Sequence, residues 1–176
     1  MGARACFRAA ASALVLVLVG CGAGHESGSG GRTLDEYVKE ECTLMADFND
    51  RFQRLLHDFA ANSRSQTALA DTVDAFGDLY DDMWVKSKKL GDPPNGEGVD
   101  AEAEAVAKSA VAQFHDIALS IRAAKTDNDL QAAVAKVPDL AERMVKQGAE
   151  MKTKYPTPEL DQARKAVPGC SELFGG

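Results

Sequence analysis

Apolar residues recur every three or four positions through most of this chain, and that spacing constrains its fold more than any other feature. Because an α-helix turns once every 3.6 residues, the spacing collects these side chains on one face of a helix. The pattern predicts four amphipathic helices, and no segment carries a β-hairpin signal. The apolar positions are Val38, Met45, Phe48, Phe52, Leu55 and Phe59; Leu69, Val73, Phe76, Tyr80, Met83, Trp84 and Leu90; Ala103, Ala107, Ala110, Phe114, Ile117 and Ile121; and Leu130, Val134, Val137, Ala141, Met144 and Met151.

Capping residues mark where these helices begin. Thr33 and Glu36 have the spacing of a capping box, in which each side chain satisfies a backbone N–H of the other residue. Asp100 is a favourable N-cap residue, and Thr126 with Asp129 forms another capping pattern. The expected helices cover about 33–61, 65–90, a stretch that starts after Asp100, and 126–155.

Prolines and glycines mark where helices end or bend. The segment "GDPPNGEG", residues 91–98, is expected to be a loop. Pro138 falls inside the fourth helix and predicts a kink or a break into two short helices. Thr157 and Pro158 are expected at the N-cap and first position of a short final helix that ends before 168–169. The predicted fold is therefore all-α, an antiparallel up-down-up-down four-helix bundle with a short C-terminal helix over 33–176.

The N-terminal segment is apolar but short. Arg4 and Arg8 precede a run of about eleven apolar or small residues, Ala9 to Val19. A membrane-spanning helix needs about 20 residues. A positive start followed by a short apolar run is instead typical of a signal peptide.

The residues after this run are Leu18-Val19-Gly20-Cys21. They resemble the lipobox of bacterial lipoproteins, in which an aliphatic residue, a tolerant position and a small residue precede a cysteine. The resemblance covers residues 1–21 only, and a plain signal peptide with a chance cysteine is the alternative. It implies that residues 1–20 are removed and that Cys21 carries a diacylglycerol, with further acylation (palmitate) at the new amine. Two or more acyl chains would hold the protein on the membrane.

The lipidated Cys21 would be followed by a flexible tether over 21–32. Its glycine- and serine-rich sequence, "GAGHESGSGG", has almost nothing to bury, and ten such residues span roughly 16–19 Å. We expect His25 to be a solvated spacer residue. The expected location is the extracytoplasmic face of the cell membrane, or the outer membrane if the host has one, since Gly22 is not the aspartate of an inner-membrane retention signal.

Two cysteines remain after Cys6 leaves and Cys21 is lipidated. Export places Cys42 and Cys170 in an oxidising compartment, so a disulfide between them is the expected state. An even number of antiparallel helices brings both to the same end of the bundle, next to the tether. The bond would close a loop of about 130 residues, worth about 4–5 kcal/mol in the chain-entropy model. A redox or metal pair is the weaker alternative, because neither cysteine lies in a CxxC motif.

Charge and motifs exclude several functions. The formal net charge of −7 becomes −9 when Arg4 and Arg8 are removed, because residues 1–20 contain no acid. A negative chain without clustered Lys and Arg is not expected to bind nucleic acid.

His57 and His115 lack the Glu-x-x-His spacing of a di-iron bundle, and both are expected on the surface. We expect no enzyme, no metal and no cofactor. We expect the paired acids Asp81-Asp82 and Asp47/Asp50 to be solvated on polar faces of the helices.

Two glycines inside helices point to close packing or to a small cavity. Gly77 and Gly148 each cost about 1 kcal/mol relative to Ala.

The expected function is a membrane-anchored envelope lipoprotein that binds an envelope protein or component without catalysis. The alternative is a carrier of a small apolar ligand in the bundle core. The candidate pocket residues are Phe52, Phe76, Trp84, Phe114 and Gly148.

Overall fold

The structure is a computed structural model that describes residues 32–61, 65–93 and 100–174. All regular elements in these ranges are helices, which confirms the all-α prediction. None of these helices has the length and apolar character needed to span a membrane. The long helices are α2 (Leu34–Ala61), α3 (Gln66–Leu90), α4 (Asp100–Ala123) and α5 (Asp127–Lys154), and the short ones are α6 (Pro158–Ala166) and α7 (Cys170–Leu173).

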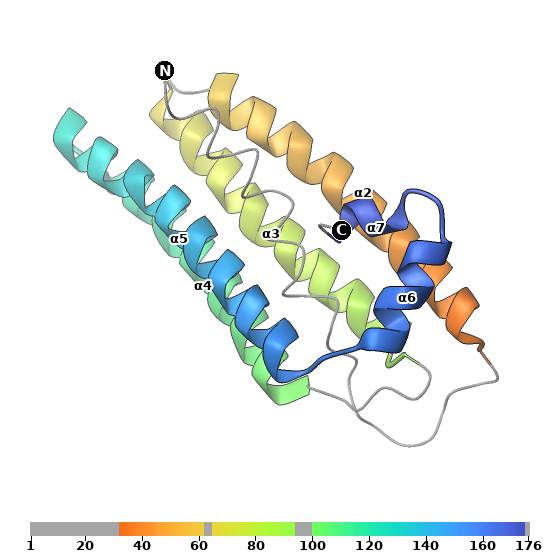
Figure 1. The fold of residues 1–176 in the computed structure, drawn as a ribbon. Helices are drawn as coiled ribbons and strands as arrows, with labels where there is room; N and C mark the ends of the chain where they lie inside the picture. Colours follow the sequence, from red (N-terminus) through yellow and green to blue (C-terminus); the bar gives the residue numbers. More distant parts are fainter. Residues whose placement is uncertain (1–31, 62–64, 94–99, 175–176) are drawn as a thin grey trace.

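The four long helices lie side by side and alternate in direction, as an up-down-up-down bundle requires (Figure 1). Each packs against its neighbour in the sequence: α2 against α3, α3 against α4, and α4 against α5. The two short helices pack against α2 and against each other, so the C-terminal segment lies on the first helix of the bundle (Figure 1).

Capping interactions hold the helix starts where the sequence predicts them. The Thr33 N–H donates to Glu36 Oε2 at 2.8 Å, and the Glu36 N–H donates to Thr33 Oγ1 at 3.3 Å. Thr126 and Asp129 form a complete capping box at the start of α5. Ser65 caps α3, because its hydroxyl accepts the Ala68 N–H at 3.3 Å. Local side-chain chemistry therefore sets these boundaries.

The fourth helix is continuous through Pro138, so the expected alternative of two short helices is wrong. Proline lacks the N–H that would bond the carbonyl of Val134. Pro138 lies on the exposed face of α5, where solvent can hydrate that carbonyl. Buried residues on the inward side of the helix, Val137 and Met144 among them, hold it in the core before and after the proline.

The C-terminal segment contains two helices where one was expected. Thr157 occupies the N-cap of α6 with Pro158 after it, as predicted, although the Thr157 side chain makes no capping hydrogen bond. The helix ends at Ala166, and the chain turns through Gly169, whose φ of 76° lies in the left-handed region that favours glycine. One further turn of helix, α7, then begins at Cys170.

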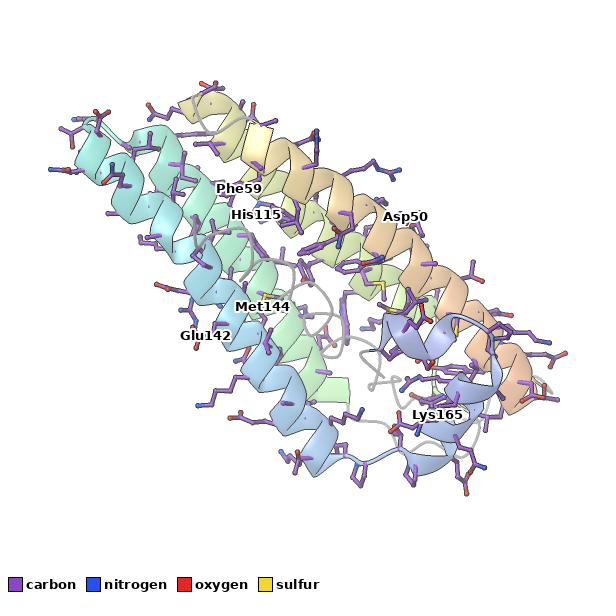
Figure 2. All side chains as sticks on the ribbon, turned by 45° about the horizontal axis from the view of Figure 1, so that its top comes forward. Asp50, Phe59, His115, Glu142, Met144 and Lys165 are labelled. Carbon is purple, nitrogen blue, oxygen red and sulfur yellow. A yellow bond between two sulfur atoms is a disulfide. The ribbon has the colours of Figure 1, made fainter. Side chains whose placement is uncertain are left out.

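The core runs along the inward faces of the long helices. All four methionines expected to fill gaps, Met45, Met83, Met144 and Met151, are buried. The seam of α2 loses burial toward its C-terminal end, where Leu55 and Phe59 are only partly buried. Figure 2 shows Met144 on α5 with its side chain directed toward the middle of the bundle.

Candidate functional site

Five aromatic rings from three helices form a continuous cluster at the centre of the bundle. The centroids of Phe48 and Phe52 on α2 are 5.8 Å apart, and Phe52 lies 5.3 Å from Phe76 on α3. Phe114 on α4 stacks on Phe76 at 5.8 Å and on Tyr80 at 5.5 Å. Tyr80 meets Phe48 edge-on at 5.2 Å, which closes the ring of contacts. These separations are those of directly packed aromatic pairs.

The structure brings together three of the five candidate pocket residues, Phe52, Phe76 and Phe114. Trp84 is buried one turn beyond Tyr80 on α3, and the Lys88 ammonium lies 5.8 Å from the centre of its ring. Gly148 is buried on α5. Sequence reasoning did not single out Phe48 or Tyr80 for this group, although both stood on the same apolar seams.

Tyr80 is the unusual member of the aromatic cluster. Its side chain is fully buried, and its hydroxyl has no hydrogen-bond partner among the described residues. Burial raises the pKa of this phenol well above its ordinary value, so the hydroxyl stays protonated. A buried hydroxyl without a partner costs free energy, about 1–3 kcal/mol.

A disulfide joins the C-terminal segment to α2. Cys42 and Cys170 are bonded, with Cα atoms 5.5 Å apart and 128 residues of separation, which confirms the predicted pairing. Both residues are buried. Because α2 starts only eight residues before Cys42, the bond lies near the end of the bundle where the described chain begins.

A buried ion pair lies next to the disulfide. The Arg164 Nε and one terminal nitrogen donate to the two carboxylate oxygens of Glu41 at 2.8 and 2.5 Å. Arg164 also donates to Asp161 at 3.0 Å, and its guanidinium lies 4.2 Å from the centre of the Phe174 ring. Burial raises the pKa of Glu41, while the hydrogen bonds and charge of Arg164 oppose that shift. Glu41 interrupts the apolar seam of α2, but nothing in the local pattern identified Arg164 as its partner.

The outer surface between α3 and α4 carries a second polar cluster. His115 Nδ1 lies 2.5 Å from Asp74 Oδ1, and its Nε2 lies 3.9 Å from Asp78 Oδ1. Arg122 donates to Asp74 at 3.1 Å and to Asp71 at 2.8 Å. The hydrogen bond from His115, followed by that from Arg122, lowers the pKa of Asp74.

His115 lies at the surface, as expected, although it is not fully solvated. The side chain is half-buried, and its ring rests on Gly77, where an added Cβ would lie 2.9 Å from the ring. The buried Gly77 therefore allows close packing, which was one of the two explanations predicted for it. His57, by contrast, is 83% exposed beside Asp58, in agreement with the prediction.

Two of the four paired acids named from the sequence, Asp47 and Asp82, meet basic side chains. Asp82 pairs with Arg51 and Lys86, and Asp47 pairs with the same two residues. Hydrogen bonds from Arg51 and then Lys86 lower the pKa of Asp82. No group of three or more His, Cys, Asp or Glu side chains in the described chain is arranged to hold a metal ion.

A shallow groove of about 340 Å³ lies between α4 and α5, with the buried Ile117 on its lining. Arg143 on α5 spans it by donating to Gln113 on α4 at 2.9 Å. Charged and polar side chains make up the rest of the groove lining, and such a lining suits a polar partner surface more than an apolar ligand. This α4–α5 groove is lined by Gln113, Asp116, Ser120, Lys136, Asp139 and Arg143, besides Ile117.

Cys21, the signal peptide over 1–20 and most of the tether, with His25, lie outside the described residues. Comparison with known proteins adds no family: no family model, no curated protein and no solved structure matches the chain.

Proposed function

We propose that this chain is a membrane-anchored lipoprotein of the bacterial cell envelope whose helical bundle binds an envelope protein or component without catalysis. The lipobox-like sequence ending at Cys21 supports the anchor. The observation that carries the proposal is the Cys42–Cys170 disulfide, because such bonds persist in the oxidising compartments outside the cytoplasm.

The anchor is tested by the intact mass of the protein taken from its own membranes. The expected product begins at Cys21 and carries two or three acyl chains, and a Cys21→Ser variant carries none and leaves the membrane fraction. Cys6→Ser is the matched control, because it removes a cysteine from the same segment without touching the lipobox or the disulfide. A wild-type protein that retains residues 1–20, or that has an unmodified Cys21, would contradict the anchor.

The α4–α5 groove is the surface proposed to bind. Its exposed charges from Lys136 and Asp139 present hydrogen-bonding groups of both signs, and Ile117 adds an apolar contact. A photo-crosslinking residue at Asp139 in living cells should trap one defined partner. The same residue at Asp50, which is exposed on α2 far from α5 (Figure 2), should not. Equal crosslinking from both positions would contradict a specific surface.

The second candidate, a carrier of a small apolar ligand, has one observation in its favour. The Tyr80 hydroxyl is buried among aromatic rings, has no hydrogen-bond partner among the described residues, and could donate a hydrogen bond to the polar end of a ligand. Native mass spectrometry of the unreduced protein distinguishes the two functions. A carrier retains a stoichiometric small mass that leaves on denaturation, and a Tyr80→Phe variant retains less of it. A binding module retains no such mass.

A further inference from the structure

The polar cluster between α3 and α4 has one feature that no other part of the described chain shares: a histidine that is held on one ring nitrogen and accessible on the other. His115 Nδ1 donates a short hydrogen bond to Asp74 Oδ1, 2.5 Å away, and Arg122 holds Asp74 in place. Because the proton of the neutral imidazole is on Nδ1, the free lone pair is on Nε2. The side chain of His115 is 37% exposed, and its Nε2, which has no hydrogen-bond partner in the described chain, is not among the buried unpartnered polar atoms, so solvent reaches it.

Asp78 supplies a second donor on the accessible side. Its carboxylate is 78% exposed and lies 3.9 Å from His115 Nε2, too far for a hydrogen bond. Zinc binds imidazole nitrogen and carboxylate oxygen at about 2.0–2.2 Å, which places two such ligands about 3.3 Å apart in a tetrahedral site. The exposed Asp78 side chain needs to move by only a fraction of an ångström to reach that separation.

We propose that His115 Nε2 and Asp78 form a site for a divalent transition-metal ion of the zinc class, with Asp74 as the positioning residue behind the imidazole. Metal-binding histidines commonly donate their other N–H to a carboxylate, which orients the ring and makes the free nitrogen more basic. In this cluster Asp74 is the carboxylate that accepts the Nδ1–H of His115. The protein supplies two ligands, and water or a donor from a binding partner completes the coordination.

Gly77 provides the room for this arrangement. An added Cβ would lie 2.9 Å from His115 Cε1 and 3.0 Å from Nε2, so any larger residue would push the ring away from α3. The glycine therefore leaves room for the imidazole beside Asp74 and Asp78, which lie three residues before it and one residue after it on α3.

The chain contains a matched control for the site. His57 and Asp58 are also a histidine and an aspartate in proximity, with Nδ1 and Oδ1 3.5 Å apart, but they are adjacent residues on one helix. The His57 side chain is 83% exposed, and among the residues that the structure describes no second carboxylate orients its ring. A metal ion that bound any exposed histidine–aspartate pair would bind there equally well.

The test is a calorimetric titration of the full chain, purified in mild detergent, with Zn²⁺ alone. Prior treatment with iodoacetamide caps free thiols, which would otherwise compete for zinc. We expect His115→Gln to weaken the tightest zinc binding at least tenfold, Asp78→Asn to weaken it about threefold or more, and His57→Gln to leave it unchanged. Asp74→Asn should cost about tenfold, as the loss of an orienting partner does.

Two further readouts separate a metal site from a structural role. The ¹⁵N signal of His115 Nε2, not that of Nδ1, should shift on addition of zinc, and the melting curve of each variant by circular dichroism should show that it is folded. Zinc affinity that is equal in wild type and His115→Gln, or that falls equally in His57→Gln, would overturn the proposal. A shift confined to Nδ1 would overturn it as well.

Discussion

Replacing Arg164 with methionine tests the buried ion pair that holds the C-terminal segment on α2. The substitution keeps an apolar side chain in contact with Phe174 but removes the two hydrogen bonds that the guanidinium makes to Glu41. Glu41 is 0% exposed, so it would be left as a buried carboxylate without its countercharge. Breaking a buried pair in this way costs about 3–5 kcal/mol, a large part of the 5–15 kcal/mol typical of a domain.

The free energy of unfolding from urea denaturation, measured with the disulfide intact, gives the size of the effect. The double variant Glu41→Leu/Arg164→Met should recover most of the loss, because two apolar side chains need no countercharge. A loss of less than about 1 kcal/mol in the single variant would contradict the buried position of the pair. A double variant as unstable as the single one would show that packing, rather than charge, is responsible.

The pH dependence of the single variant provides an independent check. Burial raises the folded-state pKa of Glu41 above its ordinary value of 4.5, and the variant lacks the arginine that opposes this shift. A group with a raised folded-state pKa contributes stability below its unfolded pKa and loses that contribution as the pH rises through the folded pKa. Arg164→Met should therefore be less destabilised at pH 5 than at pH 7.5. An equal loss at both pH values would refute this account of Glu41.

Three other substitutions have expected outcomes in the same unfolding assay. Cys42→Ser/Cys170→Ser removes a link across 128 residues, and the chain-entropy model predicts a loss of about 5 kcal/mol; an unchanged midpoint would contradict it. Gly77→Ala should destabilise by up to about 2 kcal/mol, because its Cβ meets the His115 ring at a cost that exceeds the helix-propensity gain of about 1 kcal/mol, whereas a stabilised variant would show that the ring moves freely. Phe114→Ala removes a ring stacked on two others and should cost about 3–5 kcal/mol; a loss below 1 kcal/mol would mean that the cluster is loosely packed.

Helix boundaries were predictable because the interactions that set them lie within one turn. Thr33 with Glu36 and Thr126 with Asp129 are three residues apart, so the chemistry that caps each helix is visible in a four-residue stretch. The continuity of α5 through Pro138 was not predictable in this way. It depends on which face of the helix the proline occupies, and on the buried residues that hold the helix on either side.

The candidate site was predicted only in part, for a related reason. Periodicity identified Phe52, Phe76 and Phe114 as inward-facing, and the structure places them in one cluster. It could not show that Tyr80 would be the ring between Phe48 and Phe114, or that the Tyr80 hydroxyl would find no partner in the described part of the chain. Which seam residues meet depends on the rotation of each helix about its axis, and the sequence spacing specifies that rotation only to within a broad stripe.

The sequence by itself determined the all-α class, the four long helices, their alternating directions and the Cys42–Cys170 pairing. The helices follow from local periodicity and caps, their directions from counting how often the chain reverses, and the pairing from counting the cysteines expected to remain after export. Tertiary structure alone decided that Glu41 meets Arg164, 123 residues away, and that His115 meets Asp74, 41 residues away. Such pairs form only when two helices present particular side chains at the same height and angle. Packing of the whole core sets that geometry, and no short stretch of sequence contains it.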